Sequence, residues 1–166
     1  MSTTSGEDVV TSQYMGFRLG DEDYAVPILR VKEIIAYSPV THVPGMPMVV
    51  LGVINLRGKV VPVVDLASKF GMVRRPVTKW SCIVIVEADM EGQRTEVGIL
   101  TDSVSQVLDL APRDIQPPPA FGTRVRVDFL EGLGSQEGGF VLLLNLDRLL
   151  SVPELLAAAV AAEQAA

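Results

Sequence analysis

The sequence predicts a mainly β fold, with closed barrels or a sandwich as the two open arrangements. The apolar runs are short, rich in valine, and closed by glycine, proline or acidic turns, as strands are. Helical signals are few. An internal repeat, described below, predicts two similar barrels in tandem with a groove between them.

Strands are expected along most of the chain after a flexible tail at residues 1–13. A first hairpin joins residues 14–19 to residues 24–29 through an acidic turn. Further strand-like runs follow at residues 50–66, 81–88, 95–104 and 140–146. Short strands separated by frequent turns are typical of small barrels.

Residues 50–66 are expected to form a second hairpin with a tight polar tip, Asn55-Leu56-Arg57-Gly58. The tip carries one arginine in an otherwise apolar segment. A guanidinium group on a rigid loop suits partner recognition, because it offers a fixed fork of donors. From this local pattern, Arg57 is either a recognition residue or a solvated turn arginine.

Two helical segments are expected. Asp65 can cap a short helical turn over residues 67–70, which Gly71 ends. Near the C-terminus, Ser151 and Glu154 form a capping-box pattern ahead of an alanine-rich run, which predicts a terminal helix over residues 151–166.

The internal repeat organises the chain. At an offset of 80 residues, 52–70 overlays 132–150 without gaps, and at an offset of 73, 25–35 overlays 98–108. The matched pairs include Gly52 with Gly132, Gly58 with Gly138, Asp65 with Asn145, Val31 with Val104, and Glu33 with Gln106. Either the gene segment was duplicated, or valine- and glycine-rich segments match by chance. Duplication predicts one barrel over about 14–78 and another over about 79–150, and exchange of strands between them is compatible with this division.

The repeat bears on the hairpin tip. The glycine of the tip is present in both copies, because Gly58 aligns with Gly138. The arginine is not, because Arg57 aligns with Glu137. A residue needed for the turn itself would be expected in both copies. This asymmetry favours a recognition role for Arg57.

Composition narrows the function classes. The chain has 166 residues, enough for one domain or two small barrels that share an interface. Its net charge is −6 and it has no lysine-rich block, which disfavours nucleic acid as a partner. No apolar run is long enough to span a membrane and no signal peptide is visible, so the cytoplasm is the expected compartment.

Catalytic patterns are missing from the sequence. His42 is the only histidine and Cys82 the only cysteine, so no zinc ligand cluster and no internal disulfide are expected. There is no nucleophile elbow, phosphate loop or dinucleotide fingerprint. We therefore expect a protein that is not an enzyme and needs no metal or cofactor.

With these features assembled, the chain resembles the CheW-like domain family of bacterial chemotaxis. The motifs that carry the resemblance are FRLGDEDYAVPI, VKEI, GVINLRGKVVPVVDL and GILTDSV, which lie at residues 17–28, 31–34, 52–66 and 98–104. The resemblance covers nearly all of residues 14–150, treated as one such domain. It implies two five-stranded SH3-like barrels around a shared core, and no catalysis.

The resemblance also implies partners. Adaptors of this family couple the cytoplasmic tips of transmembrane chemoreceptors to the histidine kinase CheA. The receptor tip lies in the groove between the barrels, and the kinase regulatory domain docks on barrel ends. The protein is then expected in the cytoplasm, recruited to membrane-associated receptor arrays.

Six positions match family residues implicated in partner contact. They are Val31, Glu33, Gly52, Asn55, Arg57 and Val104. Val31 and Val104 are repeat mates, so both could border one groove, whereas Gly52 could permit close approach of a partner. The two valines and Gly52 also fit plain core or turn positions.

Two other functions remain open at this level. One is a CheW-like adaptor of a parallel array that governs surface motility or development. The other is a small-barrel protein that binds an oligonucleotide or a small ligand, although aromatic residues, at 5%, are sparse for base stacking.

Overall fold

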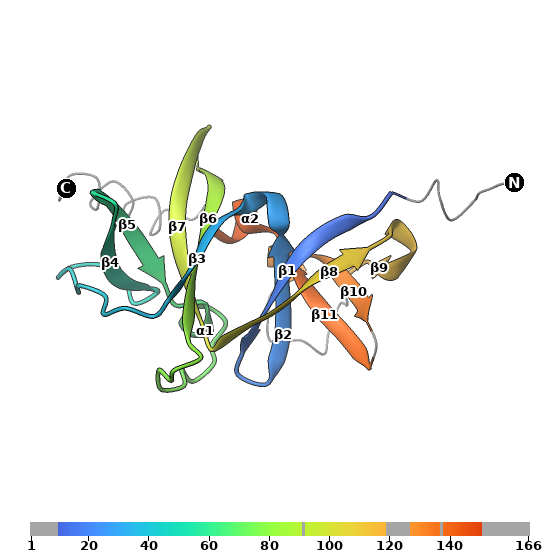
Figure 1. Cartoon of the computed structure of the whole chain (residues 1–166), viewed down its shortest axis with the longest axis horizontal. Helices are drawn as coiled ribbons and strands as arrows, with labels where there is room; N and C mark the ends of the chain where they lie inside the picture. The colour runs from blue at the N-terminus through green and yellow to red at the C-terminus, as the bar shows by residue number, and fades with distance from the viewer. Residues whose placement is uncertain (1–9, 91, 119–126, 137, 151–166) are drawn as a thin grey trace, which may run out of the picture.

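The computed structural model describes residues 10–90, 92–118, 127–136 and 138–150. Two β-sheets dominate it, and Figure 1 shows them side by side. One has five strands in the order β3-β6-β7-β5-β4, and the other has six in the order β8-β1-β2-β11-β10-β9. We call them the first and the second barrel. The predicted mainly β fold of two barrels is confirmed, with β9 as a two-residue addition to the second.

The expected runs correspond to β1, β2, β4, β5, β6, β7 and β11, whereas β3, β9, β10 and most of β8 lie outside them. The strands are β1 (Ser12–Leu19), β2 (Glu22–Pro27), β3 (Val31–Ala36), β4 (Val50–Leu56), β5 (Lys59–Val64), β6 (Cys82–Met90), β7 (Gln93–Thr101), β8 (Ser103–Leu110), β9 (Ile115–Gln116), β10 (Leu130–Gln136) and β11 (Gly139–Leu144). Most of the flexible tail expected at residues 1–13 lies outside the described residues, and β1 begins within its expected range, at Ser12.

Helices are short, as predicted. They are α1 (Leu66–Lys69), α2 (Leu146–Leu150) and the single 3-10 turns η2 (Ile28–Arg30), η3 (Pro112–Asp114) and η4 (Val127–Phe129). Asp65 occupies the N-cap position of α1, and the side-chain oxygen of Asn145 accepts a hydrogen bond from the Arg148 N–H of α2 at 3.2 Å. The helix expected over 151–166 lies outside the described residues.

Strands are exchanged between the two halves of the chain. The N-terminal strands β1 and β2 belong to the second barrel, and β6 and β7 belong to the first. Two parallel pairings make the joins: Ala25 of β2 lies opposite Leu143 of β11, and Gly98 of β7 lies opposite Val63 of β5. The division expected near residues 78 and 79 is therefore not the division between the sheets.

The strand registers reproduce the sequence repeat. The β4–β5 hairpin has an irregularity between Val50 and Gly52, and the β10–β11 hairpin has one between Leu130 and Gly132, 80 residues later. The two joining pairs are also repeat mates, Ala25 with Gly98 and Val63 with Leu143. Matching register at matching offsets supports duplication rather than chance similarity.

The hydrophobic core consists of one cluster shared by both barrels and one smaller cluster inside each barrel. The shared cluster takes residues from both barrels, including Phe17 and Tyr24 of the second and Val84 and Ile99 of the first, all fully buried. A separate small cluster fills each barrel. The shared cluster holds the barrels together, because its apolar surface would be exposed if they separated.

Candidate functional site

The tip of the β4–β5 hairpin is a two-residue turn made by Arg57 and Gly58. Leu56 pairs with Lys59, and the turn residues have φ angles of 54° and 83°. Two positive φ values are those of the turn that matches strand twist in a tight hairpin. Among the described residues, Arg57 is the only non-glycine with positive φ. The Gly58 N–H donates to the side-chain oxygen of Asn55 at 2.8 Å, which holds the turn.

Arg57 forms a two-pronged ion pair with Glu33. Its Nη1 donates to Glu33 Oε2 at 3.1 Å, and its Nη2 donates to Oε1. The hydrogen bonds from Arg57 hold the pKa of the Glu33 carboxyl below its ordinary value, and Glu33 raises the pKa of Arg57. The Arg57 side chain is 73% exposed and that of Glu33 27%. The hairpin tip and strand β3 thus present one joined, charged surface.

Val31 and Val104 occupy equivalent places on equivalent strands. Val31 pairs with Val86 on β6, and Val104 pairs with Phe17 on β1. Both valines are half-buried and pack against the shared core. They therefore lie where the two barrels meet.

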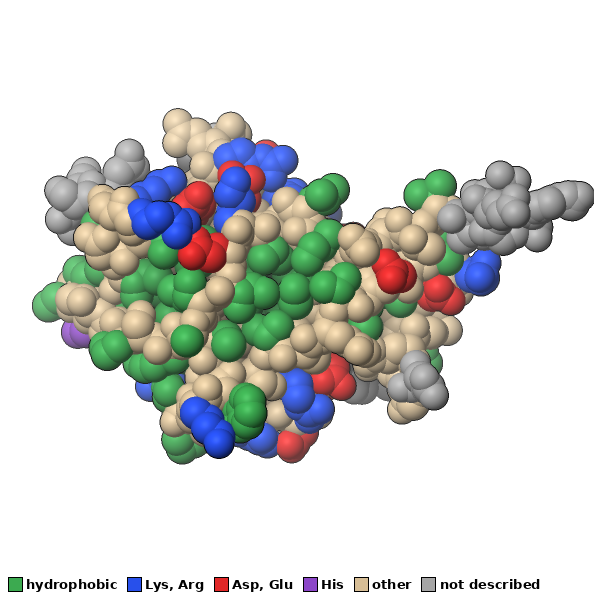
Figure 2. All heavy atoms as spheres, viewed as in Figure 1, with side chains coloured by type: hydrophobic (Ala, Val, Ile, Leu, Met, Phe, Trp, Pro, Cys, Tyr) green, Lys and Arg blue, Asp and Glu red, His purple; other side chains and the backbone are tan. Residues whose placement is uncertain are grey.

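A second pair of repeat mates extends this apolar surface. Ile34 of β3 and Val107 of β8 are 38% and 43% exposed. Figure 2 shows hydrophobic side chains gathered near the middle of the face, in the space between β7 and β1 of Figure 1. We call Val31, Ile34, Val104 and Val107 the apolar strip.

Gly52 is buried, and its surroundings explain the residue type. A Cβ atom there would lie 2.1 Å from the carbonyl oxygen of Thr41. Its repeat mate Gly132 is equally confined, with the Gln116 carbonyl oxygen 2.6 Å from the Cβ position. In both barrels a backbone segment crosses directly over the glycine. This packing accounts for Gly52 without any partner.

The six predicted site residues therefore fall into three groups. Glu33, Asn55 and Arg57 are brought together at the hairpin tip. Val31 and Val104 border the junction of the barrels, and Gly52 is apart from both groups.

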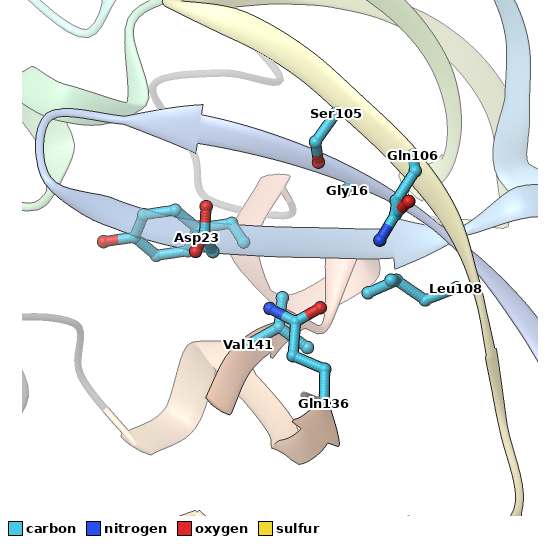
Figure 3. A pocket seen from close by; sticks show the side chains of 8 residues that line it. Gly16, Asp23, Ser105, Gln106, Leu108, Gln136 and Val141 are labelled. Carbon is cyan, nitrogen blue, oxygen red and sulfur yellow. The ribbon is translucent and has the colours of Figure 1, made fainter. Parts of the chain in front are cut away.

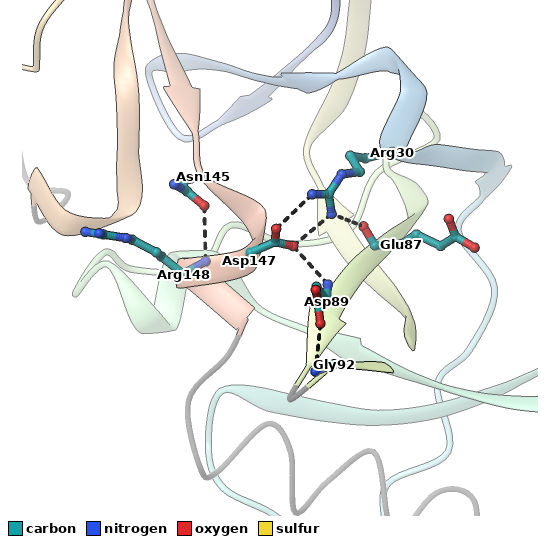
Figure 4. A network of polar contacts seen from close by, with 7 residues as sticks. All are labelled: Arg30, Glu87, Asp89, Gly92, Asn145, Asp147 and Arg148. Atoms are coloured by element: carbon teal, nitrogen blue, oxygen red, sulfur yellow. Dashed lines mark hydrogen bonds and ion pairs between the residues drawn. The ribbon is translucent and has the colours of Figure 1, made fainter. Parts of the chain in front are cut away.

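A polar network also connects the two barrels at their junction. Sequence patterns gave no indication of it. Arg30 donates to both carboxylate oxygens of Asp147 at 2.8 Å and to the Glu87 carbonyl at 3.1 Å, as Figure 4 shows. The Asp89 N–H donates to Asp147 at 2.9 Å. The hydrogen bonds from Arg30 hold the pKa of Asp147 below its ordinary value. The network joins η2, β6 and α2, which lie far apart in the sequence. No local spacing of residues could therefore reveal it.

Two chemical findings complete the site. Within the described ranges, no group of three or more His, Cys, Asp or Glu side chains is placed to hold a metal ion. None of the helices described in the structure has the length and apolarity that crossing a bilayer requires.

Comparisons with known proteins agree with this architecture. The model of the CheW-like domain matches residues 13–154. The chemotaxis protein CheW of Klebsiella aerogenes is 36% identical over 155 residues, which cover 93% of this chain and 90% of that protein. That of Rhizobium meliloti is 37% identical over 135 residues, covering 81% and 84%.

A solved structure extends the likeness to three dimensions. The crystal structure of the scaffolding protein TtCheW from Thermoanaerobacter tengcongensis superposes with a TM-score of 0.78 at 32% identity, over 87% of this chain and 96% of that one. The sequence match spans both barrels and the structural match preserves their arrangement. The chain belongs to the CheW-like domain family.

Proposed function

We propose that this protein is a non-catalytic scaffold of chemotaxis that couples the cytoplasmic tips of chemoreceptors to the regulatory domain of the histidine kinase CheA. It acts in the cytoplasm, at membrane-associated receptor arrays. The relatives support the scaffold role, since they are named chemotaxis proteins and, in one case, a scaffolding protein. The proposal that it couples receptors to CheA rests on the residues of the hairpin tip and of the apolar strip.

The observation that carries the proposal is the exposed ion pair at the hairpin tip. Arg57 is held in a strained backbone conformation and keeps most of its side chain in solvent. A solvent-exposed ion pair contributes little to folding. Strain without a folding benefit is typical of a residue retained for recognition. The Arg57 fork can bond to carboxylates or helix-end carbonyls of a partner.

The apolar strip supports the receptor half of the proposal. It runs along β3 and β8, which the repeat relates, and it borders the junction between the barrels. A helical hairpin presents apolar residues at helical spacing, which an apolar groove can accept. The kinase regulatory domain then docks on a barrel end.

Retention by immobilised partners tests this function. We expect the full chain to be retained both by a CheA regulatory domain and by a receptor cytoplasmic fragment, and Arg57→Glu to lose at least one of the two. The matched control is Arg75→Glu, because Arg75 is also an exposed arginine, 50% exposed, in an ion pair with Asp21. Failure of the unaltered chain to bind either partner, or full retention of Arg57→Glu by both, contradicts the proposal.

A further inference from the structure

The open ends of the two barrels differ although the repeat makes them equivalent. In the first barrel, the Arg57–Glu33 pair joins the hairpin tip to the edge strand β3. In the second, Gln106 of β8 takes the place of Glu33. At the position of Arg57 the sequence has Glu137, which lies outside the described residues. The chain therefore encodes no cation at that second tip.

The first barrel has a cavity of about 410 Å³ at this end, and its wall carries the cations Arg57, Lys59 and Arg94. The two ends therefore differ in the chemistry of their walls. In the first barrel, Glu33 lies opposite Ile85, whose side chain is fully buried. In the second, the corresponding place on β1 is Gly16, at the irregularity between Met15 and Phe17. A Cβ atom at Gly16 would lie 2.5 Å from Ser105 Oγ, so the glycine makes room for the Ser105 side chain at this place.

A cavity of about 410 Å³ opens there. Its wall is polar and includes Asp23, Ser105, Gln106 and Gln136. Buried side chains such as Leu108 and Val141 also line it. Figure 3 shows these side chains around the space between β8 and the β10–β11 hairpin. The cavity thus combines an apolar lining with oxygen-bearing groups.

The polar groups of this wall have unused bonding capacity. In the part of the chain that the structure describes, the side chains of Ser105, Gln106 and Gln136 make no hydrogen bond to the protein. Of the described residues that line the wall, Asp23 alone carries a formal charge, and Arg18 forms an ion pair with its Oδ1 at 3.3 Å. The acceptors and the negative charge suit a cationic donor and disfavour an anion.

We propose that this cavity binds the guanidinium group of an arginine side chain presented by another polypeptide, which supplies from outside the cation that Arg57 supplies within the first barrel. A guanidinium carries five donors in a plane, which suits several acceptors around one space. Its methylene stem can lie along the apolar lining.

The lining also identifies the source of the guanidinium. None of the described residues that line the cavity is a lysine or arginine that could hold the α-carboxylate of a free amino acid. That carboxylate would face Asp23 and be repelled. An arginine within a peptide lacks this charge. The proposal does not depend on which macromolecule carries the arginine, so it stands apart from the pairing of receptor and kinase.

Titration with small probes tests the cavity directly. Amide NMR spectra of the full chain are recorded with Nα-acetyl-arginine amide, with the uncharged isostere Nα-acetyl-citrulline amide, and with free L-arginine. We expect saturable shifts at Ser105, Gln106 and Gln136 with the first probe, and about tenfold weaker binding of the citrulline probe. Free arginine should also bind more weakly than the blocked form.

Variants supply the matched controls. Asp23→Asn should weaken the arginine probe about tenfold, and Gln106→Glu, which restores the carboxylate of the first barrel, should strengthen it about threefold or more. Glu96→Gln alters the repeat mate of Asp23 in the first barrel and should leave binding unchanged. Spectral dispersion verifies that each variant is folded.

Several results would overturn the proposal. They are equal binding of the citrulline and arginine probes, tighter binding of free arginine than of the blocked form, shifts confined to other surfaces, and unchanged binding by both Asp23→Asn and Gln106→Glu. None of these results depends on receptor or kinase binding, so the scaffold function can fail or succeed independently.

Discussion

Arg57 and Glu33, 24 residues apart in the chain, are joined by a hydrogen-bonded ion pair between the β4–β5 hairpin tip and strand β3. The repeat mate of Glu33 is Gln106, which has no such contact among the described residues. Duplication therefore produced two similar barrels whose ends present different chemistry. The cavity at the first end is lined by the cations Arg57, Lys59 and Arg94, whereas acceptors such as Asp23 and Gln106 line the cavity at the second.

Replacing Arg57 should separate folding from binding. Asparagine tolerates the left-handed backbone conformation better than arginine does, and the turn has φ values of 54° and 83°. We expect Arg57→Asn to keep or raise the melting temperature, by up to about 3 °C, and to lose partner binding. Calorimetry and partner retention measure the two effects. A variant that is destabilised and still binds would show that Arg57 serves the fold.

The apolar strip should govern receptor binding. Ile34→Lys and Val107→Lys each place a charge on an exposed apolar position, and each should weaken binding of a receptor cytoplasmic fragment about tenfold or more, because the charge would be desolvated in the complex. The control is Val73→Lys, at a valine that is 90% exposed and outside the strip. Titration calorimetry compares the three. Equal loss with Val73→Lys would indicate a nonspecific charge effect.

Gly52 should prove essential to folding. In Gly52→Ala the new methyl group would overlap the Thr41 carbonyl, 2.1 Å away, and backbone cannot rotate aside as a side chain can. We expect a loss of about 2–3 kcal/mol in the free energy of unfolding. Gly20→Ala is the control, since Gly20 has φ of +62° with open space around it, and it should cost only about 1 kcal/mol. Urea denaturation measures both. Similar losses would contradict the role of the Thr41 contact.

Asp65 should make stability depend on pH. Burial raises the pKa of its carboxyl above 3.8, although the Ser68 N–H and Arg74 oppose the shift. The protonated form is therefore favoured in the folded state. Its contribution to stability is greatest below 3.8 and falls as the pH rises through the raised value.

The substitution Asp65→Asn tests the direction of this pH dependence. Asparagine stays neutral and can still cap α1, as Asn145 caps α2. We expect the free energy of unfolding of the variant to exceed that of the unaltered chain at pH 7, with the difference shrinking as the pH is lowered. The reciprocal Asn145→Asp should lower stability at pH 7. Denaturation curves at several pH values measure this, and a gap that widens towards acid would refute it.

Local patterns predicted many of the strands and the short helix α1, but they indicated no strand at β3, β9 or β10. The strand runs, the tip at Arg57 and Gly58, and the capping positions Asp65 and Asn145 depend on residues close together in the chain. Alternation, turn residues and caps act over a few positions, so a sequence records them directly. The repeat added the expectation of two barrels, which the sheets confirm.

Contacts between distant segments were not predictable in the same way. Glu33 and Arg57 were both expected at the site, but the bond between them arises because β3 and the β4–β5 hairpin enclose the same barrel end. The brace from Arg30 to Asp147 spans 117 positions. Gly52 fitted either close approach of a partner or a plain core position, and only the structure places the Thr41 backbone directly over it.

The sequence by itself determined a β-rich chain with an internal repeat, a tip glycine present in both copies, and one charge, Arg57, that the second copy lacks. Only the tertiary structure decided that β1 and β2 cross into the second barrel and that Asp23, Ser105, Gln106 and Gln136 line one cavity there. The physical reason is the range of the interactions. Turns and caps are bonded locally, whereas strand exchange and cavities depend on how apolar surfaces from distant segments are buried together.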